Sequence, residues 1–136
     1  MGRILAFDYG TKRIGLAVTD PSGIFVSPLD TIHPKDIEAY LKNYVKAENV
    51  SQFVVGYPLS LDDKDTDATP LVESFINRLK KVFPTIPVVL EDEAYSSKEA
   101  MQELILAGVK KSKRREKGIL DKMSAVVILK RFLEND

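Results

Sequence analysis

Three acidic side chains, far apart in the sequence, have the chemistry to hold a divalent metal ion. Asp8 ends an apolar segment, Glu93 follows the apolar run 87–90, and Asp121 opens a segment with helical periodicity. Carboxylate oxygens are the ligands that Mg²⁺ and Mn²⁺ prefer, and two such ions can hold the attacking and leaving oxygens of a phosphodiester displacement. We therefore predict that Asp8, Glu93 and Asp121 are metal ligands and catalytic residues, with two Mg²⁺ or Mn²⁺ ions.

Each acid also has an ordinary structural explanation. Asp8 could cap the turn at Gly10, Glu93 could lie in a solvated loop, and Asp121 could be favoured by the dipole of a helix N-terminus. The positions four, seven and eleven residues after Asp121 are apolar, which turns its carboxylate toward the core. If the three carboxylates meet there, we expect them to repel one another in the absence of metal.

Two basic segments are predicted to bind nucleic acid. In the first, the glycines at 10 and 15 allow close backbone approach, and Thr11, Lys12 and Arg13 can contact phosphate oxygens. An ordinary hairpin with exposed charges is the alternative. The second segment, between two expected helices, is equally open to interpretation as a solvated charge run. Its predicted phosphate contacts are Lys110, Lys111, Lys113, Arg114 and Arg115.

Composition limits the remaining possibilities. Twenty basic and twenty acidic residues cancel, so a nucleic-acid surface has to arise from local segregation of charge. Without cysteine and with one histidine, the chain has neither a disulfide framework nor a thiolate zinc site. No apolar run has the length of a signal peptide or a membrane span, so we expect a cytoplasmic protein with no membrane partner.

Hydrophobic periodicity predicts one α/β domain over residues 1–136. Functional groups of such domains gather at the carboxyl ends of parallel strands. The aspartate-rich segment 62–67 lacks the glycine and glutamate of a calcium loop and is interpreted as a mobile loop, and His33 as a helix cap. Strands are expected at 4–9, 14–19, 23–29, 53–57 and 87–91. Helices are expected around 37–45, from Thr69 to about 83, from a capping box at Ser96–Glu99 to Gly108, and from about 119 to 134.

Several strings in this order resemble the YqgF (RuvX-like) family, whose members are described as Holliday-junction resolvases and as nucleases maturing the 5′ end of precursor 16S ribosomal RNA. The resemblance covers nearly the whole chain. Its carriers are LAFDYGTKRIG at 5–15, VVGYPL at 54–59, DE at 92–93, AGV at 107–109 with the basic run, and LDKMSA at 120–125.

The resemblance implies an RNase H-like fold: a five-stranded mixed sheet in the order 3-2-1-4-5, with strand 2 antiparallel to its neighbours and helices on its flanks. It also implies metal carboxylates at Asp8, Glu93 and Asp121, and a precursor ribosomal RNA or branched-DNA substrate, with ribosomal particles as partners. One departure from the family's Asp-Glu-Arg-Leu-Thr-Thr string stands out. Ala94 replaces the arginine, which puts full activity in question because a phosphate contact is lost.

Two other functions fit parts of the sequence. The Asp-Tyr-Gly-Thr string at 8–11 also opens actin-like ATPase domains, which close a nucleotide between two such lobes. Nucleotide-induced thermal stabilisation would favour this reading. The zero net charge and Ala94 favour a module that binds RNA or ribosomes without cutting, and RNA binding without cleavage under any divalent metal would select it.

Overall fold

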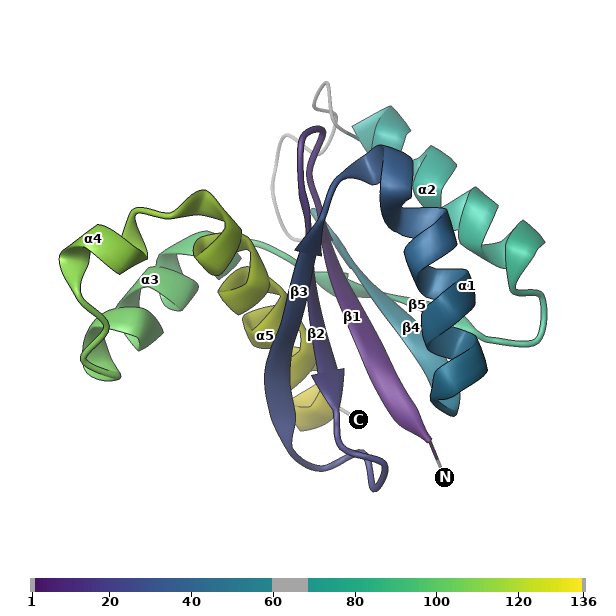
Figure 1. Cartoon of the computed structure of the whole chain (residues 1–136), viewed down its shortest axis with the longest axis horizontal. Helices are drawn as coiled ribbons and strands as arrows, with labels where there is room; N and C mark the ends of the chain where they lie inside the picture. The colour runs from purple at the N-terminus through teal and green to yellow at the C-terminus, as the bar shows by residue number, and fades with distance from the viewer. Residues whose placement is uncertain (1, 60–68, 136) are drawn as a thin grey trace.

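The computed structural model describes residues 2–59 and 69–135, and its described strands form one mixed sheet in the order β3-β2-β1-β4-β5 (Figure 1). β2 is antiparallel to both of its neighbours, whereas β1, β4 and β5 run parallel. The predicted order and directions are therefore confirmed. The strands are β1 (Arg3–Tyr9), β2 (Ile14–Thr19), β3 (Val26–Ile32), β4 (Val50–Tyr57) and β5 (Val88–Asp92).

Helices cover both faces of this sheet (Figure 1). On one face lie α1 (Ile37–Ala47), preceded by the 3-10 turn η1 (Pro34–Asp36), and α2 (Thr69–Val82). On the other face lies α5 (Lys117–Asn135), against which α3 (Ser96–Leu106) and the short α4 (Lys111–Arg114) pack. Among the described residues, no helix is long and apolar enough to cross a membrane.

Alternation along β1 explains why the sheet has two buried faces. Leu5 and Phe7 point toward α1 and α2, whereas Ile4 and Ala6 point toward α5. All four are at most 8% exposed, as expected for a central strand covered on both sides. Asp8 continues the Ile4–Ala6 alternation and therefore belongs to the α5 face.

The third strand begins later than its apolar pattern predicts, at Val26 rather than at residue 23. Asp20 is the cause, because its Oδ1 accepts hydrogen bonds from the amides of Ile24 and Phe25, both at 2.9 Å. These bonds hold residues 20–25 in a turn and keep their amides out of the sheet.

The capping box predicted at the start of α3 is wrong. Ser96 is already helical and buried, and the residue before it, Tyr95, takes the N-cap position without a side-chain hydrogen bond. The amide of Glu99 donates to the carbonyl of Tyr95 at 3.0 Å, so the helical ladder itself satisfies the group that a capping box would have used. The predicted end is confirmed, with Gly108 at φ 77°.

Two further differences concern short segments. The basic run forms α4, a single helical turn, which is too short to show a hydrophobic period in the sequence. His33 does cap η1, because its Nδ1 accepts from the amide of Lys35 at 3.1 Å. The aspartate-rich segment 62–67 lies outside the described residues.

Candidate functional site

The site begins with Asp8, which lies between two glycines on the α5 face of the sheet. Gly15 of β2 is its direct partner in the antiparallel register. On the other side, Phe7 pairs with Val55 of β4, so the next residue of β4, Gly56, lies beside Asp8. Because neither glycine has a side chain, the surface around the carboxylate of Asp8 is open to groups from other elements.

Asp121 reaches this surface because Gly15 lets the start of α5 lie directly on β2. A Cβ built on Gly15 would stand 2.0 Å from the carbonyl oxygen of Asp121 and 2.3 Å from its carbonyl carbon. No side chain fits there, since both atoms belong to the helix backbone. The sequence pattern that turned Asp121 toward the core is borne out further along α5, where Ala125 and Ile128 are fully buried.

Glu93 reaches the same surface from the other side. Its amide donates to the carbonyl of Tyr57 at 3.0 Å, which extends the pairing of β4 and β5 by one residue. A Cβ on Gly56 would lie 3.0 Å from Oε1 of Glu93 and 2.6 Å from Cδ1 of Ile128. The second glycine thus makes room for the second acid.

Electrostatics show that Glu93 and Asp121 both act on Asp8. Burial, followed by the charges of Glu93 and Asp121, raises the pKa of Asp8 to about 7. Burial and the neighbouring Asp92 also raise the pKa of Glu93. The turn after Asp8 is closed by its own backbone, from the Gly10 amide to the Arg13 carbonyl at 2.9 Å. Among the described residues no group donates a hydrogen bond to the Asp8 carboxylate, so capping does not explain it.

Arg13 is placed differently from the phosphate contact that we expected. Its Nε donates to Oδ2 of Asp121 at 2.8 Å, and both side chains are partly buried. The guanidinium therefore neutralises one acid of the group, while Asp8 has no such partner in the described chain. As they stand, no three acidic or histidine side chains within residues 2–59 and 69–135 are arranged to hold a metal ion. The oxygen donors nevertheless suit Mg²⁺ or Mn²⁺, and a bound cation would offset the burial and the like charges that raise the pKa of Asp8.

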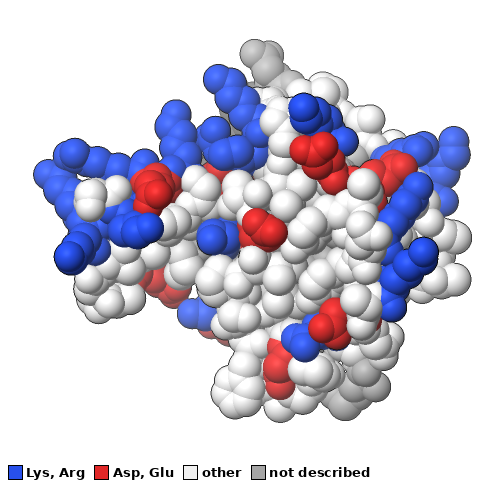
Figure 2. All heavy atoms as spheres, in the orientation of Figure 1, with Lys and Arg blue, Asp and Glu red and all other residues white. Residues whose placement is uncertain are grey.

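The other predicted phosphate contacts lie on the surface, in the β1–β2 turn and around α4. Thr11 and Lys12 are exposed in the β1–β2 turn, and Lys110, Lys111, Lys113 and Arg115 are exposed around α4. Figure 2 shows Lys and Arg gathered over the α4 end of the molecule. Arg114 differs, because its Nη1 donates to the carbonyl of Val109 at 2.9 Å and ties α4 to the chain before it.

A groove of about 630 Å³ lies elsewhere. It opens between α1 and α2 on the opposite face, next to the ion pair between Glu38 and Arg78. None of the three acids lines it. The acids instead lie where β1 and β5 end and where α5 begins, and burial raises the pKa of both Asp8 and Glu93.

Gly15 and Gly56 act as spacer glycines, and sequence reasoning missed this role: it assigned Gly15 to phosphate approach and did not single out Gly56. The available signal was a glycine within each of two buried strands, which often marks a close approach of another backbone or ligand. It also missed Arg131 on α5, whose Nη1 donates to the Asp92 carbonyl and Nη2 to Oε1 of Glu99, both at 2.9 Å. Arg131 thereby fastens the chain next to Glu93 to α5.

Comparison with known proteins gives the family and the fold of this chain. Residues 2–135 match the family model described as "RuvX: Holliday junction resolvase". A relative from Amoebophilus asiaticus is 48% identical over 135 residues, covering 99% of this chain and 96% of the relative. A second relative, from Porphyromonas gingivalis, is 41% identical and covers 99% of this chain and 98% of its own length. Both carry the name "Putative pre-16S rRNA nuclease". Thermus thermophilus RuvC, solved with a Holliday junction, superposes with a TM-score of 0.60 at 14% identity, covering 99% of this chain and 96% of RuvC. The predicted RNase H-like fold is confirmed.

Proposed function

This chain belongs to the RuvX family of Holliday junction resolvases, and from that premise we propose that it is a nuclease that hydrolyses phosphodiester bonds in structured nucleic acid. The observation that supports the proposal is that Gly15 and Gly56, on either side of Asp8, leave room for Asp121 and Glu93, and that the charges of these two acids act on Asp8. The relatives' names favour the 5′ end of precursor 16S ribosomal RNA as substrate, with Holliday-junction DNA as the other candidate.

In this proposal Asp8, Glu93 and Asp121 hold divalent metal, as Mg²⁺ or Mn²⁺ and most simply as a pair of ions. The bound metal supplies Lewis-acid stabilisation of the charge that develops on the phosphate oxygens. Asp8 is fixed by the central strand, and Glu93 by the hydrogen bond from its backbone amide to the Tyr57 carbonyl. Asp121 is fixed by the close packing of α5 on Gly15. Arg13 keeps the Asp121 carboxylate oriented until the site is filled.

The exposed basic residues of the β1–β2 turn and α4 are proposed to bind the backbone of the substrate. Phosphate contacts release counterions, so replacing Lys113, Arg114 and Arg115 by alanine should weaken binding and flatten its salt dependence. The salt slope of RNA binding measures this directly, and an unchanged slope would reject the role. We further propose that residues 1–136 act as a single domain in the cytoplasm, on ribosomal particles or their precursor RNA.

The central experiment offers purified protein both substrates, a 5′-extended 16S precursor and a four-way DNA junction, with Mg²⁺, Mn²⁺ or chelator. We expect cleavage that needs metal and that falls by about a hundredfold or more in Asp8→Asn. Asp36→Asn, an exposed acid of η1 on the other side of the sheet, is the matched control and should leave cleavage unchanged. Cleavage that resists chelator, or an active Asp8→Asn protein, would refute the proposal.

A binding module that does not cut is the second candidate. Two observations favour it: Arg13 already occupies Oδ2 of Asp121, and Ala94 is buried where the family string has an arginine. The same experiment separates the two, because a binding module would retain RNA under every divalent metal without shortening it.

A further inference from the structure

Tyr95 has an unusual backbone for its residue type. It is the one non-glycine residue of the described chain with positive φ, at φ 60° and ψ 16°. The left-handed region is unfavourable for a side chain with Cβ, and glycine or asparagine usually occupies it. Backbone strain of this kind tends to collect at functional sites, which directs attention to what the tyrosine side chain does there.

The surrounding structure holds this conformation firmly. The amide of Ser96 donates to the carbonyl of Glu93 at 3.1 Å, and the amide of Glu99 donates to the carbonyl of Tyr95 at 3.0 Å. The residues on either side, Ala94 and Ser96, are 7% and 5% exposed. With both neighbours turned inward, the ring of Tyr95 is turned outward and is 71% exposed.

The turn that carries Tyr95 adjoins Glu93 and leads into a helix that packs against α5, the helix of Asp121. Tyr95 follows Glu93 by two residues, within the turn that leads from β5 into α3. The start of α3 touches α5 close to Asp121, since the hydroxyl oxygens of Ser97 and Ser124 lie 3.4 Å apart. Tyr9, Tyr40 and Tyr44 all pack against another aromatic ring, whereas Tyr95 has no ring contact within the described residues.

We propose that Tyr95 is a base-stacking residue, which holds the nucleobase of a nucleotide next to the phosphate that the proposed nuclease would cleave. This role rests on the proposed nuclease function and adds a substrate contact to it. An exposed aromatic ring offers a flat apolar face, and every nucleobase can stack on one regardless of sequence. A rigid turn lowers the entropy lost when the base is held, and it aims the ring without help from a binding pocket.

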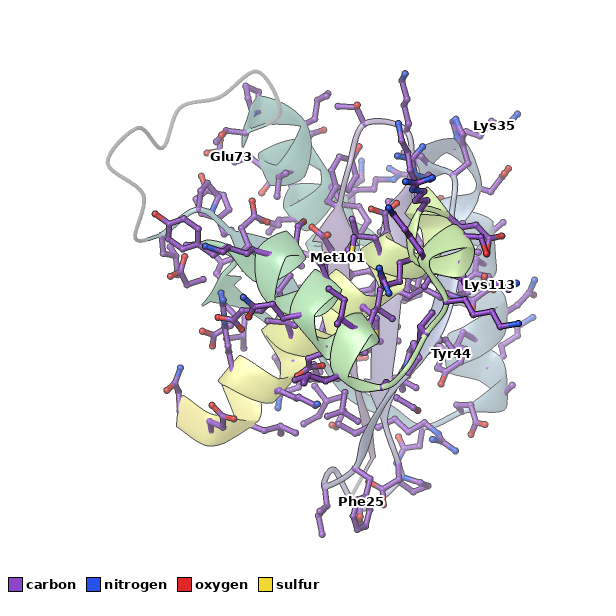
Figure 3. All side chains as sticks on the ribbon, turned by 90° about the vertical axis from the view of Figure 1, so that its left-hand side faces the viewer. Phe25, Lys35, Tyr44, Glu73, Met101 and Lys113 are labelled. Carbon is purple, nitrogen blue, oxygen red and sulfur yellow. The ribbon has the colours of Figure 1, made fainter. Side chains whose placement is uncertain are left out.

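The chain contains no tryptophan, which gives a direct test. Tyr95→Trp places a single reporter on the turn, and Phe25→Trp places one at a position of similar exposure, 73% against 71%. Phe25 lies at the tip of the β2–β3 hairpin, at the opposite end of the molecule from Glu73 (Figure 3). Glu73 marks the site end, because its Oε1 accepts from the Tyr57 hydroxyl at 2.6 Å and the Tyr57 carbonyl accepts from Glu93.

The probe is an oligonucleotide of about 12 residues, as oligouridylate and as oligoadenylate, titrated in chelator so that nothing is cleaved. We expect the fluorescence of Tyr95→Trp to fall by about half at saturation, while that of Phe25→Trp stays unchanged. In the otherwise native protein, Tyr95→Ala should weaken oligonucleotide binding at least about fivefold and Tyr95→Phe should stay within about twofold of the native protein.

Tyr95→Gly separates stacking from a structural role. Glycine relieves the strain of the left-handed backbone, so the melting temperature of the Tyr95→Gly protein should rise by a few degrees. Its affinity for the oligonucleotide should fall as in Tyr95→Ala. Equal quenching at both tryptophans, or unchanged affinity in Tyr95→Ala, would overturn the proposal. Failure of the nuclease function itself would look different: quenching at Tyr95→Trp would persist while metal-supplied native protein left the ribosomal precursor and the junction uncut.

Discussion

The two faces of the sheet are built from side chains of different size. Toward α1 and α2 the core is aromatic, with Phe7 in edge-to-face contact with Phe53 at 5.5 Å and with Phe75 at 5.3 Å. Toward α5 the central strands present small residues, with Ala6 and Ala17 beside the two spacer glycines. Large rings hold α1 and α2 away from the strands, whereas small residues let α5 approach until backbones touch.

This difference separates stability from chemistry. The aromatic face buries large apolar surface and carries none of the three acids. The small-residue face buries less apolar surface, but its small residues let the start of α5 bring Asp121 onto the sheet next to Asp8. Changes on the first face should therefore affect folding alone, and changes on the second should affect the site.

The largest effect is expected at Gly15. In Gly15→Ala the new methyl group would meet the backbone of Asp121 at 2.0 Å, so either α5 moves or the protein loses about 3 kcal/mol or more of unfolding free energy. Urea denaturation and cleavage should both show the damage. Gly118→Ala, in the first turn of α5, is the matched control because its Cβ would find only ordinary contacts at 3.6 Å and beyond. A Gly15→Ala protein with native stability and activity would contradict the close approach.

Asp8→Asn should change stability in the opposite direction. The pKa of Asp8 is raised to about 7, so the folded protein binds a proton that the unfolded chain has released, and stability falls as pH rises from 4 to 7. Removing the charge should therefore stabilise the metal-free protein by up to about 4 kcal/mol at pH 8 and by nothing near pH 4. Urea denaturation in chelator across this range measures it. A constant difference at every pH would show that Asp8 does not titrate as the site requires.

Much of this arrangement is readable from sequence, because it depends on local periodicity. The apolar segment before Asp8 placed that acid at the end of a buried strand, and the helical stripe after Asp121 predicted a carboxylate turned toward the core. The partner of Arg13 was not predictable, since 108 residues separate it from Asp121 and only the packing of α5 joins them. The left-handed Tyr95 was hidden for a related reason: a capping-box pattern fits Ser96–Glu99, and tertiary contacts of the β5–α3 turn override it.

A change on the aromatic face tests the other half of the comparison. Phe53 is fully buried between Phe7 and Phe83, so Phe53→Leu should lower the unfolding free energy by about 1–2 kcal/mol through lost burial and ring contacts. Cleavage per folded molecule should stay native at a temperature well below melting. A loss of cleavage without a matching loss of stability would show that the two faces are coupled.

The smallest effect is expected at Arg13, whose partly exposed ion pair with Asp121 belongs to the small-residue face. Arg13→Met keeps the apolar stem and removes the charge, and the lost pair should cost about 0.5–1 kcal/mol. The cost should depend on Asp8, because without the guanidinium the Asp121 charge acts unopposed on its neighbour.

A double-mutant cycle of Arg13→Met with Asp8→Asn, measured by urea denaturation at pH 8 in chelator, isolates that dependence. When Asp8 is neutral, the charge of Asp121 has less to repel, so Arg13→Met should cost less in the Asp8→Asn background than in the native one. Arg13→Lys is the control, since lysine keeps the charge and should show little of this coupling. Strictly additive effects would mean that Arg13 stabilises the start of α5 independently of the acids, and its place in the site would then be lost.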